Sequence, residues 1–289
     1  MVQIMVEKEE EEKKEKLTIE EIENLSYYDF MAYLNAPFFN VGGAGSIDEL
    51  AEMCELSEGQ KVLNVGCGTG FNSCYLVKEY GCSIVGVDIA EGMVEKAKER
   101  AEEEELTDLV KFKVGDAYDL RFEDNSFDVV ITSFVCQFLD LKKAFKEFRR
   151  VLKPGGYIAI NETYKADEIP EESLELVDRC EEIFQEIIEL PFKYNTATQW
   201  KKAFEDANLK DIQLEEVPWK SIKVRKLIKD IGGYKYLFKI LGKVIKLAWK
   251  SKKLRHRFGL LGKAKRVFRN KEAKKYVGYV LVVGKKPKI

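Results

Sequence analysis

Residues 62–70 of this 289-residue chain are Val62-Leu63-Asn64-Val65-Gly66-Cys67-Gly68-Thr69-Gly70. The apolar beginning predicts a short buried strand over residues 61–65, and a helix is expected to start near Phe71. Glycines between a strand and a helix let the backbone turn sharply and come close to a ligand, and a helix N-terminus favours negative groups. Asp88 lies 18 residues beyond Gly70, at the end of the next predicted strand, where an acid can hydrogen-bond a ribose diol. The stretch therefore predicts a binding site for a ribose-containing ligand.

The glycines are spaced as GxGxG, whereas the fingerprint of dinucleotide-binding proteins is GxGxxG, which leaves room for a pyrophosphate. Three more motifs lie between residues 55 and 165: Gly115-Asp116-Ala117 after the third predicted strand, Phe127-Asp128-Val129-Val130 in the fourth, and Leu152-Lys153-Pro154-Gly155-Gly156 before the fifth. With these motifs the chain resembles the class I S-adenosylmethionine-dependent methyltransferases. Among them it is most similar to the methyltransferase-11 type, which includes quinone, sterol and phosphoethanolamine methyltransferases.

Predicted strands alternate with helices of about ten residues, which indicates an α/β fold with a parallel sheet. The resemblance implies more: a Rossmann-like, seven-stranded, mostly parallel sheet with an antiparallel last strand and helices on both faces. It also implies S-adenosyl-L-methionine as the cofactor. Where many members of the family have Asp, this chain has Asn64, whose amide oxygen can bond the methionine ammonium but without charge attraction. By resemblance, the cofactor-binding positions are Asn64, Gly66, Gly68, Gly70, Asp88, Ile89, Asp116, Ala117 and Ser133.

Five segments are expected along the chain. They are a disordered charged tail (1–16), an N-terminal helical cap (17–54), a cofactor-binding core (55–219), a basic amphipathic helical insertion (220–275) and a last core strand with a basic end (276–289). Within the cap, residues 18–36 are predicted as one helix and residues 47–54 as another, capped by Ser46. The helical pattern of the insertion is expected to break at residues 232–233 and at Gly259.

The expected reaction is methyl transfer to a small-molecule or lipid/prenyl-type acceptor by in-line displacement, which depends mainly on alignment and exclusion of water. A His base is improbable because His256 is the one histidine and lies in the basic segment. The six cysteines form no CxxC pair, so no metal site is predicted, and reduced, mostly buried thiols are expected. The candidate substrate-facing or catalytic residues are Tyr28, Phe134, Gln137, Glu162 and Tyr164.

Charge is divided unequally along the chain. Residues 220–289 contain 24 Lys and Arg against two acids, whereas residues 1–219 contain 24 basic and 48 acidic residues. A Lys- and Glu-rich surface of the kind found in hyperthermophile proteins explains the amount of charge but not its separation. A basic amphipathic helix with Trp and Phe is typical of a membrane-surface element, so Lys220–Lys275 is predicted to contact anionic membrane. The alternative is a helical lid over the active site, with its lysines in water.

Two other functions stay open. The basic segment could hold a polyanion, which would make the protein an RNA or protein methyltransferase, although nucleic acid is the less expected partner because no recognition motif is present. The protein could also hold the cofactor without catalysis. No (D/N)PP(Y/F) run follows the fourth predicted strand, which argues against methylation of an adenine amine or a glutamine amide. A cytoplasmic location, with peripheral membrane association as an option, is expected because no apolar signal core or membrane-spanning run is present.

Overall fold

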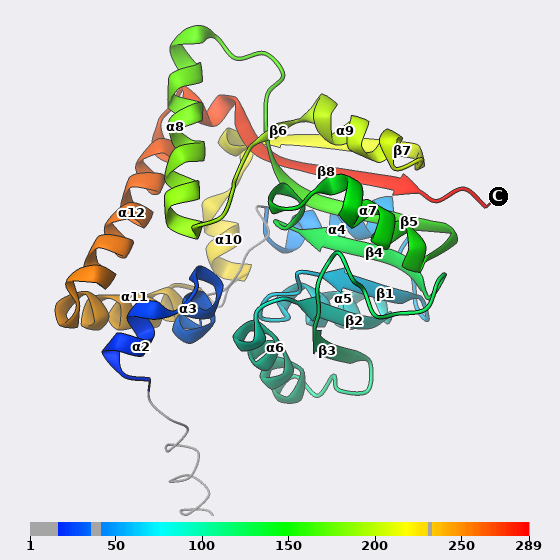
Figure 1. Ribbon diagram of the computed structural model, residues 1–289, viewed down its shortest axis with the longest axis horizontal. Helices are drawn as coiled ribbons and strands as arrows, with labels where there is room; N and C mark the ends of the chain where they lie inside the picture. The colour runs from blue at the N-terminus through cyan, green and yellow to red at the C-terminus, as the bar shows by residue number, and fades with distance from the viewer. Residues whose placement is uncertain (1–16, 36–41, 231–232, 289) are drawn as a thin grey trace, which may run out of the picture.

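The computed structural model describes residues 17–35, 42–230 and 233–288, and the predicted tail over residues 1–16 lies outside them. Within the described residues, the centre is an eight-stranded sheet in the order β3-β2-β1-β4-β5-β8-β7, with β6 paired to β5 (Figure 1). Strands β1 to β5 are parallel neighbours, and β8 is antiparallel to both β5 and β7. The strands are β1 (Lys61–Val65), β2 (Ser83–Asp88), β3 (Val110–Val114), β4 (Phe127–Ser133), β5 (Leu152–Lys165), β6 (Asn195–Thr196), β7 (Lys210–Pro218) and β8 (Val277–Lys285).

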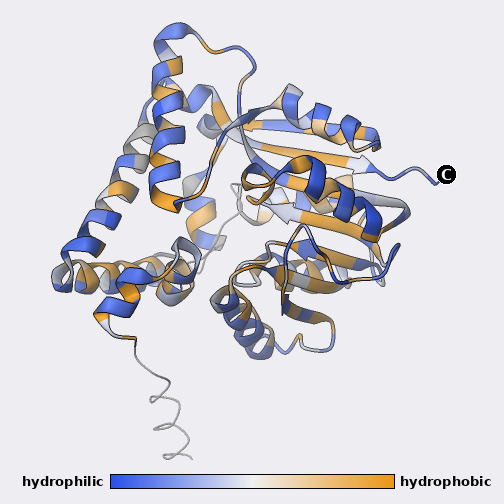
Figure 2. Ribbon diagram, in the orientation of Figure 1, coloured by the Kyte–Doolittle hydropathy of each residue, from blue (hydrophilic) through white to orange (hydrophobic). Residues whose placement is uncertain are grey.

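Helices cover both faces of the sheet. Helices α4 (Ala44–Met53), α5 (Phe71–Tyr80) and α6 (Glu91–Glu103) pack on one face, and α7 (Leu141–Val151) and α9 (Ala197–Asp206) pack on the other. Side chains alternate across a strand, so Val62 enters the first core and Leu63 the second. Figure 2 shows the strands in the middle of the sheet as largely hydrophobic, in agreement with burial on both faces.

The remaining helices form a layer beside the sheet, on the left of Figure 1. They are α2 (Ile19–Asn24), α3 (Tyr27–Leu34), α8 (Glu171–Ile188), α10 (Val224–Asp230), α11 (Gly233–Lys250) and α12 (Lys252–Arg269). Ile22, Phe30 and Leu34 of the N-terminal helices pack against Leu247 and Leu254, more than 200 residues later in the chain. This cap is therefore built from three distant parts of the chain. In the described part of the chain, no helix combines the length and the apolar character needed to cross a bilayer.

The predicted fold class is confirmed, and several local expectations are corrected. The expected seven strands are present, and the two-residue β6 is an addition. Residues 18–36 do not form one helix, because Ser26 ends the first and caps the second, accepting a hydrogen bond from the Asp29 N–H. Ser46 does not cap a helix but lies within α4, where its hydroxyl donates to the Gly43 carbonyl. Helix α12 runs through Gly259, and α11 and α12 are separated at Ser251 instead. The other predicted break, at residues 232–233, falls partly outside the described residues, because residues 231–232 are not among them.

The basic segment leaves and rejoins the sheet at one place. In the antiparallel pair of β7 and β8, Pro218 lies opposite Gly278. A Cβ at Gly278 would come within 2.1 Å of the Val217 carbonyl oxygen, so the two strands are in close contact at this end. Residues 219–276, which include α10, α11 and α12, are thus inserted between two neighbouring strands.

Candidate functional site

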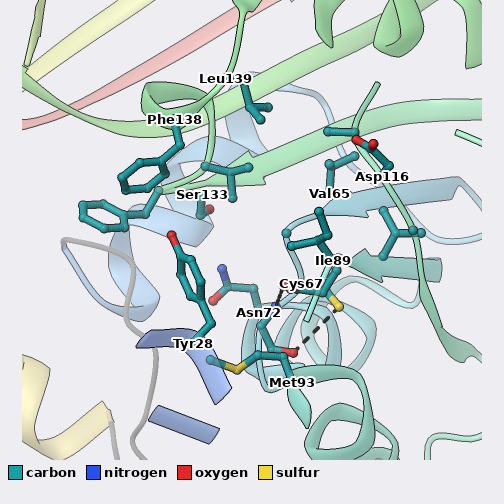
Figure 3. Close-up of a pocket in the computed structure, with 18 of the residues that line it drawn as sticks. Tyr28, Val65, Cys67, Asn72, Ile89, Met93, Asp116, Ser133, Phe138 and Leu139 are labelled. Atoms are coloured by element: carbon teal, nitrogen blue, oxygen red, sulfur yellow. Dashed lines mark hydrogen bonds between the residues drawn. The ribbon is translucent and has the colours of Figure 1, made fainter. Parts of the chain in front are cut away.

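A cavity of about 290 Å³ lies at the carboxyl ends of β1, β2 and β4. Strand β1 is flanked by β2 on one side and β4 on the other, so the cavity lies where the strand order reverses. In open α/β sheets, ligands bind at this switch point. The wall opposite the sheet is formed by Tyr28 of α3 and by Leu190, which follows α8 (Figure 3). The site therefore combines the sheet edge with the helical cap.

The polar end of the cavity is organised by Asp88 at the end of β2. One carboxylate oxygen accepts a hydrogen bond from the Gly68 N–H at 2.9 Å, and the other accepts one from the Ala90 N–H at 3.0 Å. Burial raises the pKa of this carboxyl, and these backbone bonds oppose that rise. An ionised carboxylate has about four acceptor positions. The backbone thus fixes both oxygens of Asp88, and each oxygen can still accept a hydrogen bond from a hydroxyl group of a ligand.

The glycine loop lies close to the segment after β4. Gly66 has a φ of 71°, in the left-handed region, and a Cβ at this position would meet Cγ2 of Val135 at 2.2 Å. No larger residue fits here without displacing the loop. Gly66 and Gly68 both line the cavity, as predicted, so the backbone itself forms its floor.

The far end of the cavity presents apolar and acidic groups side by side. Ile89 lines the cavity and is 72% exposed, which is unusual for a large apolar side chain. Ala117 and Asp116 also line the cavity, and one carboxylate oxygen of Asp116 accepts a hydrogen bond from the Tyr118 N–H at 2.9 Å. An exposed apolar surface with an acceptor at its edge fits a flat heterocycle that carries an amino group.

Aromatic residues form the wall between the cavity and the cap. The Tyr28 hydroxyl points toward the end of β4, where Ser133 and Phe138 lie (Figure 3). Burial raises the pKa of Tyr28 well above its usual range, so this hydroxyl stays protonated at neutral pH. The Phe134 and Phe138 rings are 5.7 Å apart, edge to face. Phe134 has a φ of 59°, an uncommon conformation for a bulky residue that often marks a functional site.

Several predicted site residues do not line the cavity. The Asn64 amide is buried and donates to the Ser73 hydroxyl at 2.9 Å. Gly70 begins α5 and faces Phe112 below the loop. The side-chain amide oxygen of Gln137 accepts a hydrogen bond from the Thr163 hydroxyl, inside the protein. Tyr164 is buried in the second core and its hydroxyl bonds Glu216. Of the candidate catalytic residues, the structure thus brings only Tyr28 and Phe134 to the cavity.

Glu162 of β5 lies behind the cavity rather than in it. The side chain is fully buried, and one carboxylate oxygen accepts hydrogen bonds from the Thr132 hydroxyl at 3.1 Å, the Val135 N–H at 2.9 Å and the Cys136 N–H at 2.8 Å. The other oxygen has no hydrogen-bond partner among the described residues. Burial raises the pKa of Glu162 to about 7, and the three hydrogen bonds oppose the rise. Glu162 is therefore placed to hold the loop that carries the aromatic wall.

This buried acid predicts a pH-dependent stability. Because the pKa is raised from 4.5 to about 7 on folding, the folded state binds more protons in this interval, and stability falls as pH rises. The group should lower the free energy of unfolding by about 3 kcal/mol between pH 5 and pH 8, at about 1.4 kcal/mol per pKa unit. Urea unfolding of the protein and of Glu162→Gln at both pH values measures this. We expect a smaller decline in Glu162→Gln, and equal declines would contradict the assignment.

Some of the residues that line the cavity are not predicted in the sequence analysis. Phe71, Asn72 and Met93 line it from α5 and α6, and Leu190 lines it from the cap. The first turn of α5 follows the glycine loop directly, so Asn72 could have been inferred from that position. Leu190 carries no such signal, because its place depends on how α8 packs against α3.

The thiols take no part in the cavity except Cys67. All six cysteines are buried and none forms a disulfide, which confirms the predicted burial. Burial raises the pKa of Cys67 well above its usual range, so its thiol is not a nucleophile at neutral pH. Among the described residues, no group of three or more His, Cys, Asp or Glu side chains is arranged to hold a metal ion.

Sequence comparison identifies relatives of the part of the chain that contains β1 to β5. Residues 63–160 match a family model described as a methyltransferase domain. Phosphoethanolamine N-methyltransferase 1 of Zea mays is 35% identical over 136 residues, which are 47% of this chain and 27% of the maize protein. The chain thus spans about a quarter of the length of that relative.

Solved structures share the fold over most of the chain. The [4+2]-cyclase SpnF has a TM-score of 0.67 at 20% identity, covering 90% of this chain and 93% of its own. Phosphoethanolamine N-methyltransferase 2 of Haemonchus contortus, solved with phosphomonomethylethanolamine and S-adenosylhomocysteine, has a TM-score of 0.64 at 21% identity. The match covers 95% of this chain and 59% of the Haemonchus chain. At these identities the likeness shows the fold, and a fold shared with a cyclase does not by itself name a reaction.

Proposed function

We propose that this protein, whose residues 63–160 form a methyltransferase domain, transfers a methyl group from S-adenosylmethionine to a small-molecule acceptor. The observation that carries the proposal is the meeting of the GxGxG loop and the Asp88 carboxylate in one cavity. A glycine loop and an acid at the end of the second strand together suit a ligand with a ribose and no phosphate.

The residues of the cavity fit this cofactor. Gly66 and Gly68 line the cavity with their backbone, which suits close approach of the methionine part of the cofactor. A side chain at Gly66 would collide with Val135, so this position requires glycine. Asp88 offers two fixed oxygens to the ribose hydroxyls. Ile89 and Asp116 suit the adenine ring and its amino group. Asn64 lies outside this set, since its amide is bonded to Ser73, so we assign it to the support of α5.

The cofactor supplies a methyl group on a sulfonium, which is open to direct attack by a nucleophile. The chain supplies alignment and a dry surface. Tyr28, Phe134 and Phe138 exclude water from the side of the cavity next to Ser133, and aromatic faces attract a neighbouring cation. The protonated Tyr28 hydroxyl can donate a hydrogen bond to an acceptor molecule but cannot serve as its base. The proposed acceptor therefore attacks without the aid of a strong base.

The aromatic wall also bears on the class of acceptor. Phe134, Phe138, Phe192 and Phe184 form consecutive ring contacts with centroids 5.0–5.8 Å apart, and the first two of these rings line the cavity. Such a surface binds apolar groups by burial and cannot solvate a highly charged molecule. We therefore propose a lipid- or prenyl-type acceptor. No described residue of the basic segment 220–275 lines the cavity, which favours the membrane-surface alternative over a lid.

The direct test is transfer of labelled methyl from S-adenosylmethionine into a fractionated extract, with Asp88→Ala as the inactive control. We expect label in the organic-soluble fraction and none with the variant. Label confined to water-soluble small molecules would refute the lipid-type acceptor but retain the methyl transfer. Label in RNA or protein would refute the small-molecule class, and cofactor binding without transfer to any fraction would refute the enzymatic proposal.

A further inference from the structure

One side of α11 is an apolar stripe that no described residue covers. Its members are Tyr234 (57% exposed), Phe238 (66%), Leu241 (49%), Ile245 (48%) and Trp249 (83%). They recur at intervals of three and four residues, which places them on one face of the helix. At about 1.5 Å per residue the stripe is roughly 22 Å long. The other side of α11 is anchored to the protein, because Leu247 is buried against α2, α3 and α12.

Positive charge accompanies the stripe. Helix α11 has five lysines and no acid: Lys235, Lys239, Lys243, Lys246 and Lys250. At about 3.6 residues per turn, these lysines lie on one side of the stripe, with the half-buried Lys243 farthest from it. Lys252 and Lys253, at the start of α12, are also exposed and extend the charge beyond the end of α11. The helix thus presents an apolar face bordered by cations.

We propose that α11 docks on a bilayer surface that contains anionic lipids, with the stripe in the interface and the lysines against the lipid phosphates. Tyr234 and Trp249 lie at the two ends of the stripe, and both have amphipathic rings that favour the headgroup level. Lysine stems can lie along apolar surface while the ammonium groups reach polar headgroups. A basic helix with a strong apolar face lies in the plane of the membrane rather than across it.

The charge of the whole chain orients this contact. Residues 220–289 carry an excess of 22 positive charges, and residues 1–219 an excess of 24 negative charges. An anionic surface attracts the first part and repels the second, so α11 and α12 should face the membrane, with the acidic part of the chain away from it. A polyanion such as RNA satisfies the lysines but leaves Leu241 and Ile245 without an apolar partner. The stripe therefore favours a lipid surface.

Helix α3 connects the docking helix to the cavity. Phe30 and Leu34 pack with Leu247 of α11, and the Tyr236 hydroxyl donates to the Asn35 carbonyl at the end of α3. Tyr28, on the same helix, lines the cavity. The wall of the site is thus one helix away from the proposed membrane contact. The docking proposal does not depend on methyl transfer, because it concerns binding alone.

Vesicle binding of the full chain, without cofactor, tests the proposal. Sedimentation is measured with two kinds of vesicle. One contains phosphatidylcholine alone, and the other contains about 40% phosphatidylglycerol, an anionic lipid. We expect binding to the anionic vesicles and at least about tenfold weaker binding to the neutral ones. Trp249 should show a blue-shifted emission on binding, and the shift should disappear in Trp249→Phe.

Two sets of substitutions separate apolar contact from charge. Phe238→Ser with Trp249→Ser should weaken binding at least about tenfold, as should the triple change of Lys235, Lys239 and Lys246 to Gln. These side chains are exposed, so the fold should not depend on them. The matched controls are Leu109→Ser with Leu174→Ser, and Gln at Lys142, Lys143 and Lys202, which remove the same chemistry from exposed sites elsewhere. Both controls should bind like the original protein.

Several outcomes would overturn the proposal. Absence of binding to anionic vesicles would do so. So would binding that salt abolishes but the serine substitutions leave intact, because the contact would then be charge alone. The protein could instead fail to bind vesicles and self-associate, with the self-association lost in Phe238→Ser with Trp249→Ser. That result would assign the stripe to contact with a second copy of the chain. Retention by RNA that these substitutions leave unchanged, again without vesicle binding, would assign the lysines to a polyanion.

Discussion

Replacing Asp88 with alanine is expected to weaken S-adenosylmethionine binding by at least about 100-fold. The carboxylate offers one oxygen to each ribose hydroxyl in the proposed complex, and a hydrogen bond to a charged group is worth about 1.5–3 kcal/mol. Two such bonds amount to at least about 3 kcal/mol, and each 1.4 kcal/mol is a factor of ten in affinity. The substitution also removes the acceptor that fixes the Gly68 N–H, which disturbs the loop beneath the ligand. Titration calorimetry measures the affinity directly.

The matched control is Asp108→Ala, which removes an exposed carboxylate just before β3, at the opposite end of that strand from the cavity. It changes the net charge equally and should leave affinity unchanged. A similar small loss in both variants would mean that Asp88 acts through general charge. An Asp88→Ala affinity within threefold of the original protein would refute its assignment to the ribose.

The second large effect is expected for Gly66→Ala, which should abolish detectable cofactor binding. Its Cβ would lie 2.2 Å from Cγ2 of Val135, so the loop or the segment after β4 must move. The left-handed backbone costs about 1–2 kcal/mol for a residue with a side chain, and the overpacked contact about 1–3 kcal/mol more. We expect the free energy of unfolding to fall by about 3 kcal/mol, measured by urea denaturation.

Gly59 provides a control that separates these two causes. Its φ is 80°, close to that of Gly66, but a Cβ there meets nothing within 4 Å. Gly59→Ala should therefore show the backbone cost alone, about 1–2 kcal/mol, with cofactor binding intact. Adding Val135→Ala to Gly66→Ala removes the Cγ2 atom and should restore part of the binding. Equal effects of the two glycine substitutions, or no recovery in the double variant, would refute the steric explanation.

The sheet and its cofactor edge are predictable from the sequence because their signals are local. The GxGxG turn, the acid at Asp88 and the alternation of strands with helices each depend on a few neighbouring residues. The short β6 is not predictable, since two residues carry no periodic pattern and pair with β5 only after the chain has folded. The cap at Ser26 is not predictable from the sequence either, because the apolar residues recur at helical spacing on both sides of it and therefore indicate one continuous helix.

The substrate side is less predictable because it depends on contacts between distant segments. Tyr28 reaches the cavity through the packing of α3 on α11 and α12, which no local pattern encodes. Residues on β5 show the limit of reasoning from strand ends. Glu162 and Tyr164 follow the sheet edge in sequence, but β5 continues to Lys165, so both side chains stay inside the protein. The division of charge was visible in the sequence, whereas the exposed stripe depends on which face of α11 meets the cap.

The pairing of Pro218 with Gly278 has a consequence for the ancestry of the protein. Residues opposite each other in an antiparallel pair lie about 5 Å apart, and a loop of two to five residues is enough to join such strands. The segment 219–276 is therefore a module that can be gained, exchanged or lost at one point, without a change in the register of the sheet. Its departure would leave the Asp88 side of the cavity untouched and would remove the helices that support α3 and α8. In the terms of the two proposals, recognition of the acceptor and contact with the membrane would then change together, while the glycine loop and Asp88 would keep their arrangement.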